Sequence, residues 1–534
     1  MSRIPCLILE DDDLLAVNKP PGIATHRAAP WLPPGLVEVL ERARPGVRLG
    51  IHQRLDRATS GVILFAKTDR ANASLARQFA ARDARKTYLF ATAGRANATA
   101  FEVATPVGGK SARTRFCFER NLAGGLALWR AEPETGRTHQ VRLHAAARGL
   151  LIVGDASRAN GVGADRGARG RSPTSSKAGG ANPPDAFSPL LLHAARLEIR
   201  HPATRATLRL EAPLPPWFEE FDPFTRRASA AVTLRKALVD SEETEAFRLI
   251  HAEGDGFPLV TVDRLGEWLY AEDFTRAGLR DDELLARFPF ARAARGLICC
   301  RAEPGARRES KRVVCGETPP EEIVIRENGV KYCLHLLDPG GTGLFFDQRE
   351  NRRRFAALSA GKKVLNLFAY TCGFSVAAAR GGAKETVNVD VSRHALEAGR
   401  RNFRLNGLDD AAHRFLAWDA REAVRRLARR GERFAVAVLD PPVFGRSKSG
   451  GVFSVKGDFS DLAAETLGLL ETGGRLLASV NFGAWGPEDF EHALRHAARR
   501  ARREIAVFDW APQGFDFPIA PGGPAHLKAA WLRV

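Results

Sequence analysis

The stretch KVLNLFAYTCGFSVAAARGGAKETVNVD, residues 363–390, places a run of small residues between two short apolar runs. The apolar runs, 363–368 and 386–390, have the length and composition of buried strands, and residues 374–380 suit a helix. The pattern continues with one helical stretch and two strand-like runs, at residues 394–405, 415–418 and 434–439. Alternation of strands and helices predicts a parallel, doubly wound sheet.

The residues before this stretch are organised differently. Residues 1–222 alternate short β-type runs with turn residues and contain a helical stretch at 73–85, which predicts a mixed α+β fold. Within them, residues 157–187 are polar and rich in glycine, serine and basic residues, so we expect a flexible basic insertion there. A solvated loop is favoured over an RNA-binding tail. A basic helical stretch at 224–239 and short strand-like runs between 247 and 337 predict a small β-rich module.

The composition is that of a globular protein with an anionic partner. Hydrophobic residues make up 44% and charged residues 27% of the 534 residues. No apolar run approaches the roughly 20 residues that span a bilayer, and the start of the chain lacks the pattern of a signal peptide, so we expect a cytoplasmic protein without a membrane partner. The seven cysteines are read as reduced thiols. The net charge of +18 favours a polyanion, although charge alone does not distinguish RNA from DNA or anionic lipid.

A candidate catalytic carboxylate lies near the start of the chain. Residues 52–61 read HQRLDRATSG, so that Asp56 stands in a predicted turn directly before a strand-like run. A single carboxylate held in such a turn suits attack on a sugar or removal of a proton from it. An ordinary loop before a strand would show the same local pattern.

Five motifs in order show that this part of the chain resembles the RluA-type pseudouridine synthases. They read NKPPG, KTY, ETGRTHQVRLH, VGD and LHA, at residues 18–22, 86–88, 134–144, 153–155 and 192–194. The resemblance implies that Asp56 is the catalytic carboxylate, that Tyr88 contacts the base, and that Arg142 pairs with the aspartate. It also implies that Arg54 and Arg137 contact RNA, with Arg54 filling the gap left by an extruded uridine. No cofactor is expected for this domain.

The sequence departs from the family pattern at two places. Gln53 separates His52 from Arg54, so we assign no role to His52. The tyrosine expected shortly after Asp155 is missing, which makes RNA contacts on that side doubtful.

Three carboxylates follow successive predicted strands in the C-terminal part of the chain. Asp390, Asp419 and Asp440 each stand at or just after the end of a strand-like run. Carboxylates at the carboxyl ends of parallel strands suit a nucleoside cofactor. The turn at 368–373 lacks the GxGxxG pattern, so a dinucleotide is not indicated.

This part of the chain resembles the class I S-adenosylmethionine-dependent methyltransferases of the large-subunit rRNA branch. The motifs are GLFFDQRENRR at 343–353 and NLFAYT at 366–371, and residues 253–258 and 262–264 resemble the β-rich domain that accompanies them. The resemblance implies binding of S-adenosylmethionine by Asn366, Phe368, Tyr370, Thr371, Gly373, Asp390, Asp419 and Asp440. Asp440 is also expected at the catalytic centre, and Arg349 and Phe444 are expected to contact RNA. No metal site is expected.

The atom that receives the methyl group depends on the cysteines. Methylation of cytosine C5 in this branch needs a cysteine thiolate, and no cysteine follows Cys372, which lies in the cofactor loop. Residues 479–481 and 447–448 are more similar to those of guanine-N7 methyltransferases. We therefore favour guanine N7 or another base nitrogen over cytosine C5.

Together these features predict a bifunctional RNA-modifying enzyme of class α+β and α/β, acting on rRNA, in three domains. Residues 1–222 form a mixed α/β pseudouridine synthase domain, 223–340 a linker helix and a small β-rich domain that grips RNA, and 341–534 a doubly wound, Rossmann-like methyltransferase domain. The alternative is an RNA-binding or ribosome-assembly factor in which one or both catalytic domains are degenerate. The sequence does not indicate an oligomeric state.

Overall fold

The computed structural model describes residues 4–94, 99–155, 189–220, 222–275, 278–302, 309–339, 341–446, 452–520 and 522–534. The predicted basic insertion at 157–187 and the pair 447–448 therefore lie outside the described residues. The chain divides into two compact units. Unit 1 comprises Met1–Thr25 and Val39–Leu238, and unit 2 comprises His26–Glu38 and Val239–Val534.

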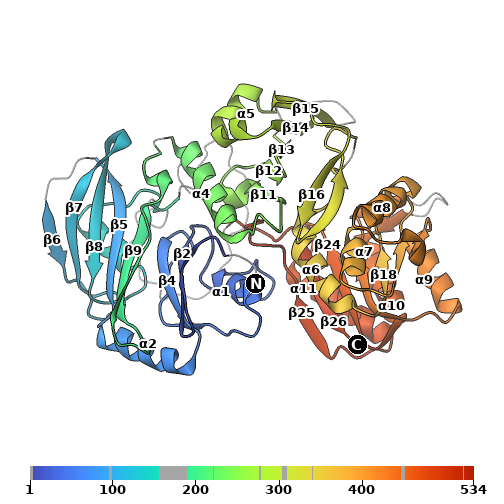
Figure 1. Ribbon diagram of the computed structural model, residues 1–534, viewed down its shortest axis with the longest axis horizontal. Helices are drawn as coiled ribbons and strands as arrows, with labels where there is room; N and C mark the ends of the chain where they lie inside the picture. Colours follow the sequence, from blue (N-terminus) through green and yellow to red (C-terminus); the bar gives the residue numbers. More distant parts are fainter. Residues whose placement is uncertain are drawn as a thin grey trace. The chain divides into compact units, whose positions relative to one another are not determined.

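Unit 1 is built on one large, mostly antiparallel sheet (Figure 1). Its strands run in the order β1-β2-β4-β9-β5-β8-β7-β6, with β3 paired to β4 and β10 paired to β9. The strands are β1 (Leu7–Glu10), β2 (Leu14–Lys19), β3 (Gly50–Ile51), β4 (Ser60–Ala66), β5 (Arg85–Ala93), β6 (Ala100–Val103), β7 (Thr114–Leu122), β8 (Leu126–Pro133), β9 (Leu192–Arg200) and β10 (Thr207–Glu211). The helices are α2 (Asp69–Ala81), α3 (Gln140–Ala147) and α4 (Pro223–Leu238), and α1 (Leu36–Ala43) begins in the short segment assigned to unit 2.

Helix α2 lies four residues earlier than the sequence predicted. It begins after Thr68, whose side chain caps the helix by accepting a hydrogen bond from the backbone N–H of Ala71. It ends at Ala81, and the next residue, Arg82, has a left-handed backbone with φ of 64°. The predicted bounds of 73–85 were wrong because Thr68 caps the helix and makes it begin earlier.

The first part of unit 2 is the predicted β-rich module. A five-stranded sheet has the order β11-β12-β13-β14-β15, and β16 and β17 form a separate antiparallel pair. The strands are β11 (Ala246–His251), β12 (Val260–Leu265), β13 (Trp268–Asp273), β14 (Gly296–Ala302), β15 (Glu309–Gly316), β16 (Ile323–Glu327) and β17 (Val330–Leu334), with helix α5 (Asp281–Arg287) after β13.

The second part of unit 2 is a seven-stranded sheet in the order β20-β19-β18-β21-β24-β26-β25. The first five strands of this order are parallel, and β26 then pairs antiparallel with β24. The edge strand β25 pairs antiparallel with β26 and so runs in the same direction as the first five. The strands are β18 (Lys363–Leu367), β19 (Glu385–Val389), β20 (Arg414–Leu416), β21 (Phe434–Leu439), β24 (Leu470–Val480), β25 (Val507–Trp510) and β26 (Lys528–Arg533), and a small ladder joins β22 (Phe444–Arg446) to β23 (Val452–Ser454). The helices are α6 (Arg349–Ser359), α7 (Gly373–Arg380), α8 (Arg393–Leu405), α9 (Ala420–Arg429), α10 (Val455–Leu467) and α11 (Pro487–Arg500).

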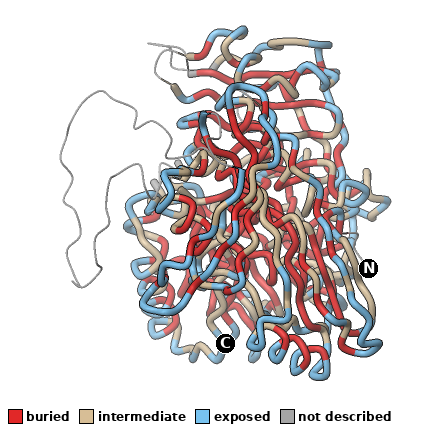
Figure 2. The backbone as a smooth tube through the Cα atoms, turned by 90° about the vertical axis from the view of Figure 1, so that its left-hand side faces the viewer, coloured by how far each residue is buried: buried red, intermediate tan, exposed pale blue. Residues whose placement is uncertain are grey.

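Strand order in this sheet fixes where a ligand binds. From β18 the chain moves outward to β19 and β20, then returns to the other side of β18 at β21. Ligands of open α/β sheets bind outside the carboxyl ends of the strands at such a reversal. The central strands are apolar and buried because helices cover them on both faces. Figure 2 colours the backbone by burial, and buried residues, in red, make up much of its interior. Within the described part of the chain, no helix is both long and apolar enough to cross a membrane.

Candidate active sites

The first candidate site surrounds Asp56, in the turn that leads into β4. A backbone hydrogen bond of 3.0 Å from Thr59 N to Asp56 O closes the turn. Gly61, with φ of +115°, lets β4 run close to β9, since a Cβ atom there would lie 2.2 Å from the carbonyl oxygen of Ala194. The glycine of the motif is therefore required by the approach of two strands beside the turn.

Two side chains from one end of α3 meet the carboxylate of Asp56. His139 Nδ1 lies 2.8 Å and Arg142 Nη1 lies 3.0 Å from the same oxygen, Asp56 Oδ2. On the other edge of the guanidinium, Arg142 donates to both oxygens of Asp155, with Nε at 2.9 Å from Oδ2. The side chain of Asp155 is only 6% exposed, so this ion pair is well shielded from water.

Electrostatics keep Asp56 ionised and Tyr88 neutral. Burial alone would raise the pKa of Asp56, but the hydrogen bonds and charges of His139 and Arg142 outweigh it and lower that pKa below its usual value. Burial, together with the negative charge of Asp56, raises the pKa of Tyr88 on β5 to about 12. The phenol therefore keeps its proton at neutral pH and can donate a hydrogen bond.

Lys19, at the end of β2, holds the backbone of the same turn by hydrogen bonds. Its buried ammonium group donates to the carbonyl oxygens of Pro20, Ile23 and Arg57, at 3.0, 2.8 and 3.2 Å. Arg57 directly follows Asp56, so Lys19 ties the motif at 18–22 to the turn that carries Asp56. Burial lowers the pKa of Lys19 to about 7.

The remaining residues predicted for this site lie at its edge. Arg54 is exposed, two residues before Asp56, and Arg137 is half-buried, with Nε donating to the carbonyl oxygen of Ser111 at 3.3 Å. His52 points to Asn72 instead of Asp56. His139, Asp155 and Lys19 lie inside the quoted motifs, but no role was predicted for them from the sequence.

The second candidate site is a cavity of about 500 Å³ at the reversal point between β18 and β21. Five of the predicted residues line it, namely Phe368, Tyr370, Asp390, Asp419 and Asp440. Apolar side chains contribute much of the remaining wall, among them Val391, Trp418, Pro441, Pro442 and Phe453. The wall is therefore mainly apolar, with three carboxylates placed on it.

The loop after β18 has an unusual backbone. Phe368, Tyr370 and Cys372 all have left-handed conformations, with φ of 60°, 48° and 61°. Asp390 holds this loop, because its Oδ2 accepts from the backbone N–H of Tyr370 at 2.8 Å while its Oδ1 accepts from Ser392 N. Three such residues in five positions indicate stored strain of the kind found at ligand sites.

Three of the predicted cofactor residues do not line the cavity. Asn366 is buried and donates to Ser375 Oγ, and buried Thr371 donates to the carbonyl oxygen of Gly343. Gly373 begins α7, and a Cβ atom there would approach Leu344 to 2.8 Å. These residues hold the loop after β18 in shape without lining the cavity. Asp419 does line the cavity, and its Oδ1 also caps α9 by accepting from Arg421 N and Glu422 N.

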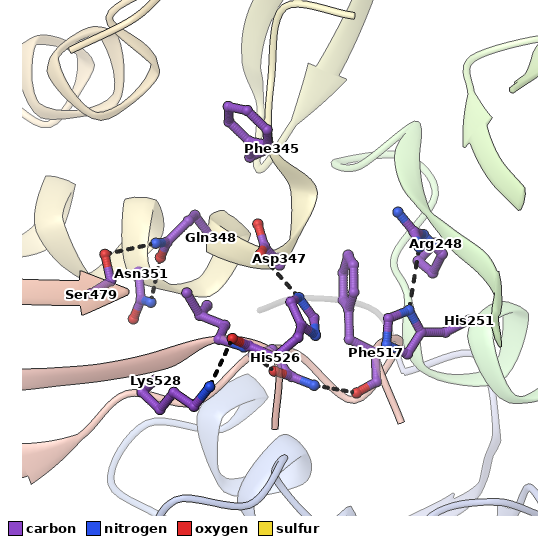
Figure 3. A network of polar contacts seen from close by, with 12 residues as sticks. Arg248, His251, Phe345, Asp347, Gln348, Asn351, Ser479, Phe517, His526 and Lys528 are labelled. Carbon is purple, nitrogen blue, oxygen red and sulfur yellow. Dashed lines mark hydrogen bonds and ion pairs between the residues drawn. The ribbon is translucent and has the colours of Figure 1, made fainter. Parts of the chain in front are cut away.

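A chain of hydrogen bonds orients Asp440, and Figure 3 shows its first two links, from Asn351 to Gln348 and from Gln348 to Ser479. Asn351 Nδ2 donates to Gln348 Oε1 at 2.7 Å, and Gln348 Nε2 donates to Ser479 Oγ at 3.0 Å. The hydroxyl of Ser479 in turn donates to Asp440 Oδ1 at 2.5 Å. Burial raises the pKa of Asp440 to about 6, the hydrogen bond from Ser479 opposes that rise, and the charge of Asp347 adds to it.

Asp347 brings a fourth carboxylate to the same cavity. It comes from the short 3₁₀ turn η5 (Phe346–Gln348), and His526 Nε2 donates to its Oδ2 at 3.2 Å, as Figure 3 shows. Burial would raise the pKa of Asp347, but His526 outweighs burial and lowers that pKa. Asp347, Gln348 and Ser479 lie within the quoted motifs, but no role was predicted for them from the sequence.

The residues predicted to contact RNA in unit 2 differ in exposure. Phe444 is 70% exposed close to the cavity, and Phe345, on the cavity wall, is 60% exposed. Arg349, by contrast, is 3% exposed and forms a bidentate ion pair with the buried carboxylate of Asp516, at 2.8 Å on both arms. Its guanidinium is thus used inside unit 2, and we do not retain it as an RNA contact.

The thiols and possible metal ligands of unit 2 lie away from the cavity. Cys372 is fully buried, and burial raises the pKa of its thiol well above the usual value. Glu322, Cys333 and His335 bring three potential ligand atoms within 4.8 Å of one another. Arg401 already pairs with Glu322 at 2.8 Å, so a cation would compete with a guanidinium there, and we assign no ion to this cluster.

Comparison with known proteins defines the class of the chain. Residues 13–147 match the RNA pseudouridylate synthase family, and residues 283–528 match the S-adenosylmethionine-dependent methyltransferases. The chain therefore joins an RluA-type pseudouridylate synthase to a methyltransferase that uses S-adenosylmethionine, and it is an enzyme with isomerase and transferase activities.

The particular family follows from its relatives. The chain is 34% identical over 323 residues to ribosomal RNA large subunit methyltransferase I of Aeromonas salmonicida, an alignment that covers 59% of this chain and 81% of that protein. The protein of the same name from Aeromonas hydrophila is 35% identical over 324 residues, with the same coverage. The chain belongs to this methyltransferase family. Among solved structures, SMU.776, a putative methyltransferase complexed with SAH, matches with a TM-score of 0.53 and 26% identity, over 63% of this chain and 88% of that one.

Proposed function

We propose that this chain converts uridine to pseudouridine and methylates a base nitrogen, both in ribosomal RNA. The observation that carries the proposal is the presence of a complete site in each unit. Asp56 is held by two donors in unit 1, and Asp440 is oriented by a hydrogen-bond chain at a large cavity in unit 2. Since both sites retain their partners, a non-catalytic assembly factor is disfavoured.

In the synthase domain, Asp56 acts on the ribose of the target uridine, and no cofactor is needed. Its low pKa supports this role, because the reaction requires a carboxylate and not a carboxylic acid. Arg142 holds Asp56 ionised, and Tyr88 contacts the base as a neutral phenol. Arg54 and Arg137 contact the RNA around the extruded nucleotide.

In the methyltransferase domain, the cavity in unit 2 holds S-adenosylmethionine. Its apolar wall suits the adenine ring, Asp390 and Asp419 at the strand ends suit the ribose and the base, and the carboxylates suit a cationic sulfonium. When bound, the cofactor supplies an electrophilic methyl group. Asp440 and Asn481 line the part of the cavity next to Pro441 and Pro442, where a target base would lie.

A base nitrogen is the acceptor that this site favours. Attack through cytosine C5 needs a thiolate, and Cys372, the last cysteine of the sequence, is buried with its pKa raised. A nitrogen lone pair needs only proximity and alignment with the methyl group. The exposed ring of Phe444 is suited to stack on a neighbouring base.

The names of the relatives support ribosomal RNA as the substrate, and with it the cytoplasm as the place of action. We divide the chain into a synthase domain at 1–222, a helix and RNA-gripping β-rich domain at 223–340, and a methyltransferase domain at 341–534. Exposed aromatic rings and a net charge of +18 are consistent with binding of RNA.

The experiment that tests this function is mass-spectrometric mapping of large-subunit rRNA from cells with and without the gene. The proposal expects one or more pseudouridines and one N-methylated base to disappear together with the gene. A missing 5-methylcytosine would contradict the acceptor, and an unchanged rRNA would contradict the substrate.

A further inference from the structure

Three polar atoms form a tight triangle at the synthase site. Asp56 Oδ2 lies 2.8 Å from His139 Nδ1 and 3.0 Å from Arg142 Nη1, and these two nitrogens are 2.9 Å apart. Both nitrogens thus converge on one carboxylate oxygen. No hydrogen bond from a described residue reaches the other oxygen, Oδ1.

The triangle fixes the position of the proton on His139. The guanidinium of Arg142 has N–H donors and no acceptor. His139 Nδ1 can therefore accept from Arg142 as a bare nitrogen or donate to Asp56 as Nδ1–H, but it cannot do both. A bare Nδ1 lone pair 2.8 Å from an ionised carboxylate would be repulsive, whereas an Nδ1–H forms a charge-assisted hydrogen bond. We therefore assign the proton to Nδ1, which donates a hydrogen bond to Asp56, while Arg142 Nη1 donates to Asp56 and not to His139.

Gln140, which follows His139, holds the backbone that directs the His139 side chain toward Asp56. Gln140, the first residue of α3, is 3% exposed and uses its whole side-chain amide: Oε1 accepts from Thr135 Oγ1 and Arg137 N, and Nε2 donates to Arg113 O and Thr114 Oγ1. This anchor holds the turn before α3. His139 adopts a left-handed backbone there, with φ of 56°.

The left-handed backbone of His139 places its side chain on the same side of α3 as that of Arg142. His139 and Arg142 are three residues apart, so the start of α3 presents both side chains on one side, toward Asp56. A non-glycine residue in a left-handed conformation beside a catalytic carboxylate is the arrangement expected where strain serves a site. The half-exposed ring of His139 stands at the open side of the carboxylate.

We infer that His139 is a positioning residue for the pseudouridine synthase. Together with Arg142 it fixes Asp56 Oδ2, so that Oδ1 is the oxygen presented to the ribose. His139 acts through Asp56 and not on the RNA. Neither the motif resemblance nor the comparisons assign this role, and it does not depend on which RNA is modified.

The test is the rate of pseudouridine formation by His139→Ala and His139→Asn in the full-length chain. The probe is total RNA labelled with [5-³H]uridine in cells that lack the gene, because pseudouridine formation releases the tritium from C5. The asparagine keeps an N–H donor near the position of Nδ1 and tolerates a left-handed backbone. His52→Ala serves as the matched control, since His52 is a surface histidine of unit 1 that bonds to Asn72.

We expect His139→Ala to lower the single-turnover rate by about 10- to 100-fold, because a misplaced catalytic group loses alignment. RNA affinity should stay within about twofold, since the ring does not act on RNA. His139→Asn should recover most of the rate, and His52→Ala should match the parent chain. Circular dichroism of each variant establishes that unit 1 is folded.

A pH–rate profile separates positioning from a merely structural role. The groups that face Asp56 are His139 and Arg142 at the start of α3, Lys19 from β2 and Tyr88 from β5. His139 lowers the pKa of Asp56, so the acid limb of the profile should move to higher pH in His139→Ala. It should move back in His139→Asn.

Three results would overturn the inference. The first is an unchanged rate in His139→Ala. The second is an equal loss in the alanine and asparagine variants with no shift of the acid limb. The third is a loss that appears only in RNA affinity, which would make His139 an RNA contact instead.

Discussion

The guanidinium of Arg142 lies between two carboxylates, and its Nη1 reaches Asp56 Oδ2 at 3.0 Å. On its opposite edge, the guanidinium donates hydrogen bonds to both oxygens of Asp155, whose side chain is almost completely buried. The direction of Arg142 therefore depends on Asp155 as much as on Asp56. A residue outside the turn at Asp56 thus affects how the carboxylate of Asp56 is held.

Replacing Asp155 by asparagine should slow the synthase. The amide keeps the shape of the side chain but loses the charge and turns an N–H group toward Arg142, so the guanidinium moves away from Asp56. We expect the rate of tritium release to fall about 10- to 100-fold. The exposed Asp83→Asn in the same unit should leave the rate unchanged. Equal rates for the two variants would show that Asp155 does not support the site.

Unit 1 should lose stability in mild acid because of His193. This buried ring donates from Nε2 to Ala212 O and accepts from Ser60, and burial lowers its pKa to about 4, below its unfolded value of 6.5. As the pH falls from 6.5 toward 4, His193 becomes protonated in the unfolded chain but stays neutral in the native state. The free energy of unfolding should therefore drop by up to about 3 kcal/mol over that window.

The measurement is urea unfolding of the full-length chain at about pH 6.5 and about pH 5, followed by hydrogen exchange of β9 peptides. His193→Gln does not titrate, so the variant should be less stable at neutral pH and should lose less stability in acid than the parent. A parallel decline in both proteins would assign the acid sensitivity to other groups.

Asp390 should be needed for cofactor binding. It lines the cavity and holds the backbone N–H of Tyr370 in the strained loop, so its loss affects both a contact and the shape of the wall. Calorimetry should show that Asp390→Ala weakens binding of S-adenosylmethionine by about 1.5–3 kcal/mol, roughly 10- to 100-fold. The exposed Asp489→Ala, at the start of α11, is the control. Unchanged affinity in Asp390→Ala would remove this residue from the cofactor site.

The methyltransferase should gain activity as Asp440 ionises. Burial raises the pKa of Asp440 to about 6, so the rate should rise with pH through that region if the carboxylate faces the substrate. Ser479 donates to Asp440 and lowers its pKa. Ser479→Ala should therefore move the midpoint of the pH–rate profile to higher pH, whereas Ser460→Ala, on the outer helix α10, should not. A midpoint unaffected by Ser479→Ala would separate the pH dependence from Asp440.

Much of this architecture could be predicted because the signals are local. Strand and helix periodicity predicted the alternating pattern from residue 363 onward, and the rule that ligands lie beyond strand ends predicted the cavity positions of Asp390, Asp419 and Asp440. The reversed strand β26 and the edge strand β25 were not predicted, since nothing in their local sequence distinguishes strand direction.

The rest depends on partners far away in the sequence. Arg349 looked like an RNA contact, but its partner Asp516 is 167 positions further along the chain, and only the fold brings them together. The role of His139 depends on a left-handed backbone held by the buried amide of Gln140. Motif resemblance located these segments but could not supply the direction in which each side chain points.

The most direct test of the account is to measure both modifications on the same RNA with one variant, Asp56→Asn. RNA from cells lacking the gene is incubated with S-adenosylmethionine and either the parent chain or the variant, and pseudouridine and methylated bases are quantified by mass spectrometry. We predict that pseudouridine formation falls to background while methylation continues at the parent rate. Loss of both modifications, or persistence of pseudouridine, would contradict two independent active sites in one chain.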